Sequence, residues 1–288
     1  MDDERSDDRA GGTPAPLLAG RTALVTGGGA GIGRGICEAF ARHGAAVCVA
    51  DVDGGSADEV ARSLREQGAT AVAVSADVRQ ADDVAAMVAA AVHELGGLDV
   101  VVNNVGHFVF PAVPFEESTE EQWDELYATN LAHVFRVSRA ALPHLIDRGR
   151  GGSIINLSTV EAFRGIPGHP VYAAFKAGVT QFTKSLALQV SGHGIRVNDI
   201  APDVTRSAQL PYERWLTEAD TERIPQWVPL GRLGEPSDPA GVAVFLASDL
   251  SAFVTGTTIH CDGGTYAAGG WYRTNHGGRG WTNRPLDP

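Results

Sequence analysis

Tyr172 and Lys176 stand four residues apart in a stretch that favours a helix. Residues i and i+4 lie on one face of a helix, so the ammonium of Lys176 can stand beside the phenol of Tyr172. A free tyrosine has a pKa of about 10 and is a poor base at neutral pH. Because a nearby positive charge favours the phenolate, the spacing predicts that Lys176 lowers the pKa of Tyr172. Such a pair can act as a general acid/base toward an alcohol or carbonyl oxygen.

A glycine-rich turn near the N-terminus lies between a short β-branched run at residues 22–26 and a helical pattern. The turn contains Gly27, Gly31 and Gly33, and apolar residues recur at helical spacing from Ile32 onward. Glycines let the backbone approach a pyrophosphate, whose charge then meets the unpaired N–H groups at the helix start. An ordinary strand–helix turn can also be rich in glycine, but the flanking strand and helix favour a dinucleotide site.

Strand and helix patterns alternate along the chain and would position these residues. Short apolar runs such as 98–102 are typical of parallel strands buried on both faces. We expect strands at 22–26, 46–51, 70–75, 98–103, 152–157, 195–200 and 257–261, and helices near 31–43, 55–67, 80–95, 119–147, 171–191 and 237–248. The alternation predicts an α/β fold, in which a doubly wound parallel seven-stranded sheet (Rossmann) carries helices on both faces of a single domain.

The spacing of Thr26, Gly27, Gly31 and Gly33, with the Tyr172–Lys176 pair far downstream, resembles the short-chain dehydrogenase/reductase family. The resemblance covers about residues 20–265. Further landmarks of the family are matched by Asp77-Val78, Asn103-Asn104-Val105-Gly106, Asn130, Arg196-Val197-Asn198 and Asp262-Gly263-Gly264. The family has an alanine where this chain has Val105.

The resemblance implies a nicotinamide cofactor. Its binding residues, carried over position by position, would be Thr26, Gly27, Gly31, Ile32, Gly33, Asp77, Val78, Asn104, Gly106, Tyr172, Lys176, Pro202, Thr205 and Ser207. Asp51, at the end of the second strand, can accept both ribose hydroxyls of adenosine and repels a 2′-phosphate, so we expect NAD rather than NADP. Asp51 or Asp53 could also cap the helix at 55–67, and both roles can hold if each uses one residue.

The family carries a serine thirteen residues before the tyrosine, and that position is Thr159 here. A threonine hydroxyl can polarise a substrate oxygen in the same way, so we assign this role to Thr159 and keep Ser158 as the fallback. Capping of a strand end is the alternative for both residues. The resemblance also implies that Asn130 holds a water connecting Lys176 to solvent. The usual Pro-Gly of the family is Pro202-Asp203 here, which leaves the geometry of that loop open.

The reaction implied is hydride transfer between a substrate carbinol carbon and nicotinamide C4, with Tyr172 as general acid/base. The residues expected to face the substrate are His107, Phe108, Glu161, His169 and Asp203. This set is too polar for a steroid or a long acyl chain, since burying carboxylates against hydrocarbon is costly. It favours a polar secondary alcohol or ketone, cyclic ones included. A merely solvated rim is the alternative for the charged members.

Composition limits the partners. The net charge of −12 argues against nucleic acid and anionic membrane surfaces, and no apolar run approaches the ~18 residues of a membrane helix. The cysteines (Cys37, Cys48 and Cys261) have no metal-ligand spacing and are read as buried thiols of a reducing cytoplasm. In the family, helices like those at 119–147 and 171–191 pair across a two-fold axis, which implies a homotetramer.

We divide the chain into a disordered acidic tail (1–18), a Rossmann oxidoreductase domain (19–264) with a substrate lid at 203–232, and a C-terminal arm (265–288). The arm contains Trp271 and Tyr272, which we expect to be buried against their own or an adjacent subunit's lid. Two other functions stay open. One is an NADPH-type ketoreductase of acyl-carrier or polyketide biosynthesis, and the other is a catalytically silent dinucleotide-binding protein.

Overall fold

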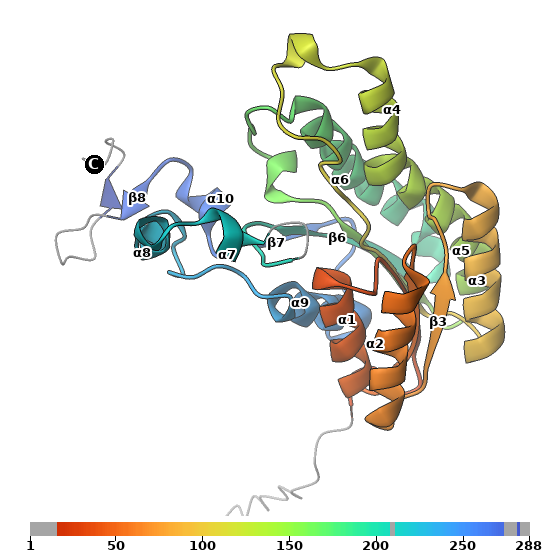
Figure 1. The fold of residues 1–288 in the computed structure, drawn as a ribbon. Coiled ribbons are helices and arrows are strands. Elements are labelled where there is room, and N and C mark those ends of the chain that lie inside the picture. The colour runs from red at the N-terminus through yellow and green to blue at the C-terminus, as the bar shows by residue number, and fades with distance from the viewer. Residues whose placement is uncertain (1–15, 208–210, 274–280, 283–288) are drawn as a thin grey trace, which may run out of the picture.

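A single twisted sheet runs through the molecule, and helices cover both of its faces (Figure 1). The computed structural model describes residues 16–207, 211–273 and 281–282. The strands of the main sheet are β1 (Thr22–Thr26), β2 (Ala46–Asp51), β3 (Ala71–Ser75), β4 (Val100–Asn103), β5 (Gly152–Leu157), β6 (Ile195–Pro202) and β7 (Thr258–Cys261). All are parallel, in the order β3-β2-β1-β4-β5-β6-β7. The predicted seven-stranded doubly wound sheet is confirmed.

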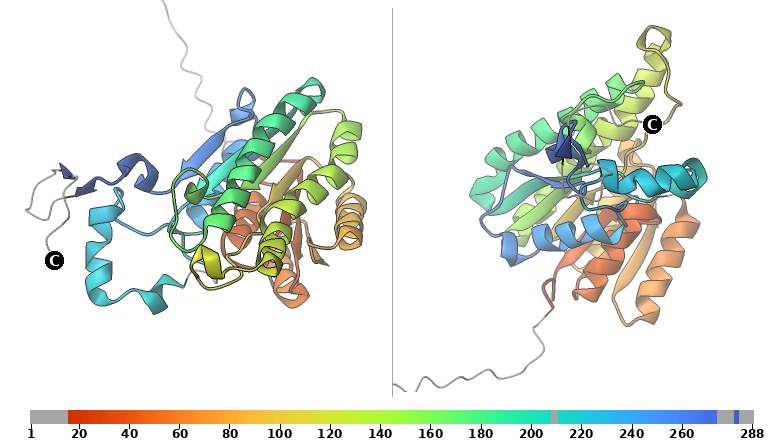
Figure 2. Two further views of the ribbon diagram at one scale, coloured as in Figure 1. Left: turned by 90° about the horizontal axis from the view of Figure 1, so that it is seen from above. Right: turned by 90° about the vertical axis from the view of Figure 1, so that its left-hand side faces the viewer.

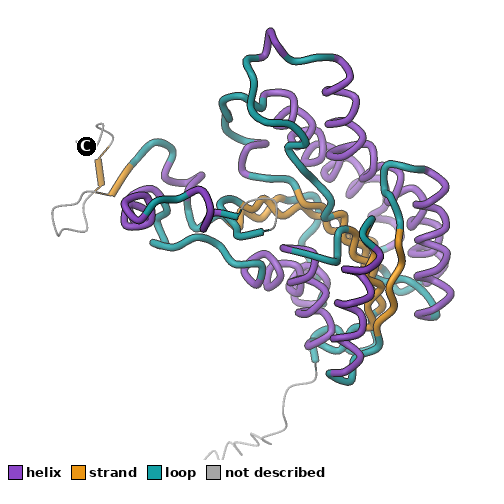
Figure 3. The backbone as a smooth tube through the Cα atoms, in the orientation of Figure 1, coloured by secondary structure: helices purple, strands orange, loops and turns teal. Residues whose placement is uncertain are grey.

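The chain reverses direction across the sheet after β3, because β4 returns to pair with the other side of β1. The carboxyl ends of β1 and β4 therefore flank a crevice, which is where open α/β sheets bind their ligands. Figure 3 shows the strands as one continuous twisted layer between the helices.

Two hydrophobic cores fill the space on either side of the sheet. One core includes residues of α1 (Gly31–Arg42), α2 (Gly54–Glu66) and α9 (Ser237–Ala247). The other includes residues of α3 (Ala81–Leu95), α5 (His133–Arg148) and α6 (Pro170–Val190). Each strand alternates its buried side chains between these cores, as in Val101 and Val102 of β4. Parallel strands covered on both faces require such apolar runs.

The helix predicted at 119–147 is helical throughout but is not one regular α-helix. It consists of α4 (Glu120–Tyr127), a π-helical turn over Ala128–Ala132, and α5. The π-turn contains Asn130, whose side-chain amide donates to the carbonyl oxygen of Leu126 at 3.1 Å. Such turns widen the helix locally and are frequent at functional sites, and the apolar periodicity does not reveal them.

The lid segment forms two helices, α7 (Tyr212–Trp215) and α8 (Glu218–Trp227), which stand apart from the main helical layers in Figure 2. A small apolar cluster of Ile224, Val228 and Leu233 lies beneath them. The strand β8 (Tyr272–Arg273) contacts α8 and pairs with β9 (Trp281–Thr282). The C-terminal arm therefore contacts the lid segment of its own chain through β8 and α8.

Two predictions concern the ends of the chain: where the N-terminal tail stops, and whether Trp271 and Tyr272 are buried. Leu18, which we assigned to the tail, is fully buried against the core, and its N–H donates to the carbonyl oxygen of His43 at 2.9 Å, so the tail assignment is wrong at its C-terminal end. Trp271 and Tyr272 are half-exposed in the single chain (50% and 37%). Residues 1–15, 274–280 and 283–288 of the tail and arm lie outside the described residues.

Candidate active site

Two adjoining cavities open at the carboxyl ends of the central strands. The first has a volume of about 640 Å³ and is lined by the glycine turn, Asp51, Asp77, Val78, Asn104 and Gly106. The second has a volume of about 330 Å³ and is lined by Thr159, Tyr172, Lys176, Pro202 and the residues around them. Ile32, Asn104, Gly106 and Ser207 line both. Most of the predicted cofactor residues and the predicted catalytic residues Thr159, Tyr172 and Lys176 thus line two adjoining cavities, whereas Asn130, Thr26 and Gly33 do not line them.

The glycine turn leaves no room for side chains. Gly27 and Gly31 have positive φ values of 63° and 52°, which favour glycine. A Cβ on Gly33 would overlap the carbonyl oxygen of Gly27. Asn104 fixes the turn to the end of β4, since its amide donates to the carbonyl oxygens of Thr26 and Gly27 at 3.0 and 3.1 Å.

The N-terminus of α1 is suited to an anion. Its N-cap residue is Ala30, which makes no side-chain cap, and the first turn contains no acidic residue. The first N–H groups of the helix consequently keep their capacity to bind a phosphate. These features fit a dinucleotide pyrophosphate.

Asp51 and Asp53 have separate roles at the end of β2. Asp53 caps α2, accepting from the N–H groups of Gly55 and Ser56 at 3.0 and 3.3 Å. The Asp51 carboxylate accepts from the Gly29 N–H at 2.9 Å and faces the larger cavity. The glycine turn thereby holds a carboxylate where an adenosine ribose would lie.

Asp77 and Val78 form another part of the same wall. The Asp77 carboxylate accepts from the Arg79 guanidinium at 2.8 Å, and this hydrogen bond lowers the pKa of Asp77. Val78 is buried, with 6% of its surface exposed. Together they present a fixed polar and apolar edge to the larger cavity.

Tyr172 lies in the smaller cavity on the first turns of α6, and Lys176 lies one turn later on the same face. The Lys176 ammonium is 5.9 Å from the centre of the Tyr172 ring and donates to the carbonyl oxygen of Leu157 at 2.9 Å. A Cβ on Gly106 would come within 2.5 Å of the Lys176 Nζ, so a larger residue there would displace the ammonium. The predicted side-by-side arrangement is present.

The pKa of Tyr172 moves in the direction opposite to our prediction. Burial raises the pKa of Tyr172, the Glu161 carboxylate raises it further, and the Thr159 hydrogen bond lowers it. Burial also lowers the pKa of Lys176 to about 8, against an opposing effect of Asp199. The predicted decrease in the Tyr172 pKa is therefore wrong for this structure, because burial and the Glu161 carboxylate outweigh the effects that favour the phenolate.

Thr159 and Ser158 point to different partners. The Thr159 hydroxyl is hydrogen-bonded to Tyr172 and lies 3.3 Å from the carbonyl oxygen of Pro202. The Ser158 hydroxyl instead donates to Asp199 at 2.6 Å, and the Ser158 N–H donates to the same carboxylate at 2.9 Å. The hydroxyl next to the tyrosine is that of Thr159.

Asn130 is fully buried behind the catalytic pair. Its Oδ1 accepts from the N–H of His107 at 3.0 Å, and its Nδ2 donates to the carbonyl oxygen of His107 at 2.8 Å. Asn130 therefore fixes the π-turn to the segment that follows Gly106. His107 itself accepts from the Val109 N–H at 2.6 Å through Nδ1, and burial lowers the pKa of His107.

One wall of the smaller cavity is charged. Arg164 donates to Glu161 at 2.9 Å and to Asp203 at 2.7 Å, with both carboxylates largely buried. Asp203 also accepts from the hydroxyl of Thr265, at 2.5 Å, on α10 (Thr265–Ala268). Tyr212 of the lid lines the cavity beside them.

The facing wall is aromatic. Phe108 lies with its ring 4.5 Å from the rings of both His169 and Tyr172. Burial lowers the pKa of His169. Of the five predicted substrate residues, Phe108, Glu161 and Asp203 line the smaller cavity and His107 lines the larger one. His169 lines a neighbouring cavity that also contacts Phe108 and Tyr172.

The loop after β6 has Asp203 where the family has a glycine. Val204, the residue after Asp203, has a positive φ of 36°, and its N–H donates to the Asp203 carboxylate at 2.8 Å. A β-branched residue in this region is strained. Thr205 is buried and donates to the carbonyl oxygen of Asp203 at 2.9 Å, and Ser207 lies against Gly31.

Sequence reasoning missed Asp199, a fully buried carboxylate in β6 behind Ser158. The available signal was that Asp199 is the one acidic residue of β6. Within the described part of the chain, no group of three or more His, Cys, Asp or Glu side chains could hold a metal ion. No helix among the described residues is long and apolar enough to cross a membrane.

The sequence of this chain is similar to those of known oxidoreductases. The family described as enoyl-(acyl carrier protein) reductase matches residues 27–266. A 3beta-hydroxysteroid dehydrogenase of Eggerthella lenta is 40% identical over 253 residues, covering 86% of this chain and 94% of that protein. A 3-oxoacyl-[acyl-carrier-protein] reductase of Chlamydia trachomatis is 38% identical over 255 residues, covering 86% and 98%.

The fold of this chain is also similar to that of a solved structure. A 7 alpha-hydroxysteroid dehydrogenase complexed with NADH and 7-oxo glycochenodeoxycholic acid superposes with a TM-score of 0.81 at 30% identity, covering 87% of this chain and 96% of that chain. This identity and coverage show a shared fold. The chain is therefore an oxidoreductase of the short-chain dehydrogenase/reductase family.

Proposed function

We propose that this protein transfers a hydride between NAD and a polar secondary alcohol or ketone, cyclic ones included, with Tyr172 as the general acid/base. The observation that carries the proposal is the convergence of Tyr172, Thr159 and Lys176 in a cavity that adjoins the glycine turn. Bound NAD would supply the hydride acceptor when the alcohol is oxidised.

The chain's own residues would handle the proton. In oxidation the hydroxyl proton of the substrate passes to the Tyr172 phenolate oxygen while the carbinol C–H bond breaks and the C=O bond forms. The Thr159 hydroxyl orients the substrate oxygen, since it already lies in hydrogen-bond contact with Tyr172. Lys176 stabilises the phenolate by its charge, and Asn130 holds the adjoining backbone in place.

The charged wall supports a polar substrate. Glu161 and Asp203 share one guanidinium, that of Arg164, and both carboxylates are largely buried. Hydroxyl groups of a substrate could donate to these carboxylates, whereas hydrocarbon against them would leave them without water.

A steroid alcohol is the second candidate, because two similar proteins are hydroxysteroid dehydrogenases. The aromatic wall around Phe108 would suit a fused ring system, and the charged wall opposes it. A 3-oxoacyl thioester reductase is a third, supported by the relative from Chlamydia trachomatis. The Asp51 carboxylate argues against NADPH and so against the predicted NADPH-type ketoreductase alternative.

A substrate panel tests the proposal. Polar cyclic and acyclic secondary alcohols, a hydroxysteroid, and a 3-hydroxyacyl thioester would be assayed for NADH formation at alkaline pH. We expect turnover of a polar alcohol to exceed that of the steroid. Steroid turnover above all polar alcohols would replace the first candidate by the second.

Cofactor choice has its own test at Asp51. Titration should show NAD binding at least ~10-fold tighter than NADP, which is about 1.4 kcal/mol. Asp51→Ala should shrink that gap. Asp53→Asn is the matched control, because it keeps the cap of α2 and leaves Asp51 in place. Equal affinities in the unmodified protein would contradict the role of Asp51.

We also propose a homotetramer. Several large apolar side chains are exposed on the single chain, among them Phe135 on α5, Leu188 on α6 and Phe253 beside β7. Apolar surface of this kind marks association sites. A mass in solution equal to four chains supports this assembly, and a monomeric mass contradicts it.

A further inference from the structure

Asp199 is a carboxylate in the middle of β6 with none of its surface exposed. Its partners are hydroxyls and one backbone N–H. The Ser158 hydroxyl, the Thr180 hydroxyl and the Thr258 hydroxyl donate to Oδ2 at 2.6, 2.9 and 3.1 Å, and the Ser158 N–H donates to Oδ1 at 2.9 Å. Four donors around one carboxylate favour its ionised form, although burial raises the pKa of Asp199.

Two of these donors lie close to catalytic groups in the chain. Ser158 precedes Thr159, and Asp199 holds both its backbone N–H and its hydroxyl, which turns Ser158 away from Tyr172. Thr180 lies one helical turn beyond Lys176 on α6, and its hydroxyl also lies 3.5 Å from the Lys176 carbonyl oxygen. Asp199 therefore links β5, α6 and β7 immediately behind the active site.

Three titratable groups surround the catalytic pair, and Asp199 is the one that acts on the charge of Lys176. Asp199 is the acidic group that raises the pKa of Lys176 against the effect of burial. On α5, the buried His133 faces the same ammonium, but burial lowers the pKa of His133 to about 3, so it is neutral at the pH of the reaction. Glu161, from the segment after β5, acts on Tyr172 and raises its pKa.

We propose that Asp199 is a positioning residue that keeps Lys176 charged and thereby supports ionisation of Tyr172 during proton transfer. A charge acting across a buried region is screened less than one at the surface. Through Ser158, the same carboxylate fixes the backbone that presents Thr159. The inference rests on the proposed function, since it needs Tyr172 to be the proton carrier.

Asp199→Asn is the decisive variant because the amide is nearly isosteric and removes only the charge. The surrounding hydroxyls can rotate to accept from the new N–H group. With Lys176 less often charged, the Tyr172 phenolate loses support, so alcohol oxidation should need higher pH. We expect the acidic limb of the kcat–pH profile to move up by about one pH unit and kcat at pH 8 to fall about tenfold.

Thr258→Val is the second variant. It removes one of the hydrogen bonds that favour the ionised form of Asp199, so Asp199 is less often charged. The profile should therefore move in the same direction by a smaller amount. It also keeps the proposal testable if Asp199→Asn does not fold. Thermal unfolding of both variants separates loss of fold from loss of charge.

The outcomes are distinguishable. An Asp199→Asn enzyme that is folded and has an unchanged pH profile would show that Asp199 is protonated or electrically remote, and would overturn the inference. A fall in kcat at every pH with no shift of the limb would show a purely structural role and would also overturn it. Full activity of Tyr172→Phe would instead overturn the proposed function, whatever Asp199 does.

Discussion

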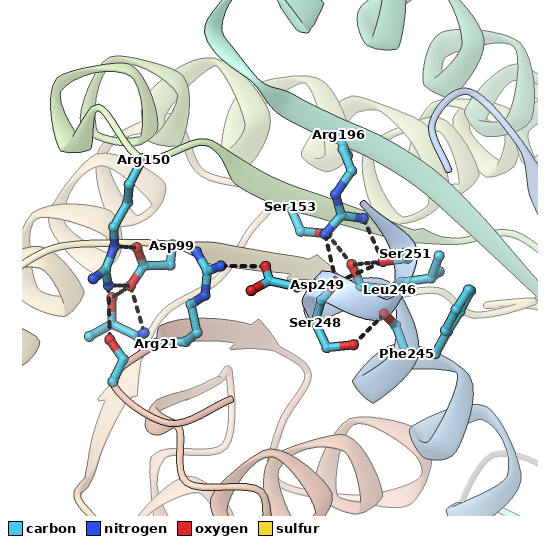
Figure 4. A network of polar contacts seen from close by, with 12 residues as sticks. Arg21, Asp99, Arg150, Ser153, Arg196, Phe245, Leu246, Ser248, Asp249 and Ser251 are labelled. Atoms are coloured by element: carbon cyan, nitrogen blue, oxygen red, sulfur yellow. Dashed lines mark hydrogen bonds and ion pairs between the residues drawn. The ribbon is translucent and has the colours of Figure 1, made fainter. Parts of the chain in front are cut away.

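One buried aspartate lies at the amino end of the parallel sheet, and another lies within β6, behind the active site at the carboxyl end. Their surroundings differ. Asp99 precedes β4 at the amino end, where Arg150 approaches its carboxylate at 2.6 Å (Figure 4). Arg148 lies 3.3 Å from the same carboxylate. The N–H and hydroxyl of Thr22 both donate to it at 2.9 Å. Asp199 in β6 is surrounded by hydroxyls instead. Both carboxylates are shielded from solvent.

Their pKa values move in opposite directions for this reason. Burial alone would raise the pKa of Asp99, but the Arg150 and Thr22 hydrogen bonds bring it down to about 2. Burial raises the pKa of Asp199, and its hydroxyl partners only partly oppose the rise. Two arginines compensate Asp99 locally, so its charge serves stability. The charge of Asp199 is compensated less completely and remains available to act on Lys176.

Tyr172→Phe should give the largest effect at the carboxyl end. It removes the proton carrier and little binding surface, so turnover should fall ~10³-fold or more while cofactor affinity is retained. Single-turnover kinetics and cofactor titration measure the two quantities. Retained turnover would show that another group carries the proton.

Thr159→Ala and Ser158→Ala form a matched pair that tests which hydroxyl faces the reaction. Thr159→Ala removes the hydroxyl in contact with Tyr172, so kcat should fall roughly several-hundredfold. Ser158→Ala removes only one of the donors to Asp199 and should cost much less. The reverse order of effects would place the polarising role on Ser158.

Asp99→Asn should reduce stability and leave chemistry unchanged. A folded pKa of about 2, against an unfolded value of about 3.9, corresponds to roughly 2 to 3 kcal/mol of the free energy of unfolding. Because the folded pKa is the lower one, this contribution is complete above about pH 4 and is lost as the pH falls through about 2. Urea unfolding at pH 7 and at acidic pH measures it.

Asp249→Asn is the control for that variant. Asp249 pairs with Arg21 at 2.8 Å at the same end of the sheet, but its side chain is 89% exposed. Water screens such a pair, so its loss should cost well under about 1 kcal/mol. Equal losses in the two variants, or a fall in kcat with Asp99→Asn, would contradict the separation of the two ends.

Sequence spacing was sufficient for the parts of the site that depend on one element or one turn. Tyr172 and Lys176 share a helical face because four residues make about one turn. The glycine turn followed from the residues themselves, since only glycine tolerates the φ of Gly27 and the closeness of Gly33 to its carbonyl oxygen. The alternation of strands and helices determined the doubly wound sheet for the same local reason.

The tertiary structure decided what depends on distant segments. The direction of the Tyr172 pKa shift reflects burial and Glu161, neither of which the four-residue spacing contains. The choice between Thr159 and Ser158 was made by Asp199, a residue on the neighbouring strand that takes up the serine. The charged wall joins Glu161, Asp203 and Thr265 from three separate segments. Hydrogen bonds and desolvation act through space, so the sequence determined which groups were present and the fold determined how each would ionise.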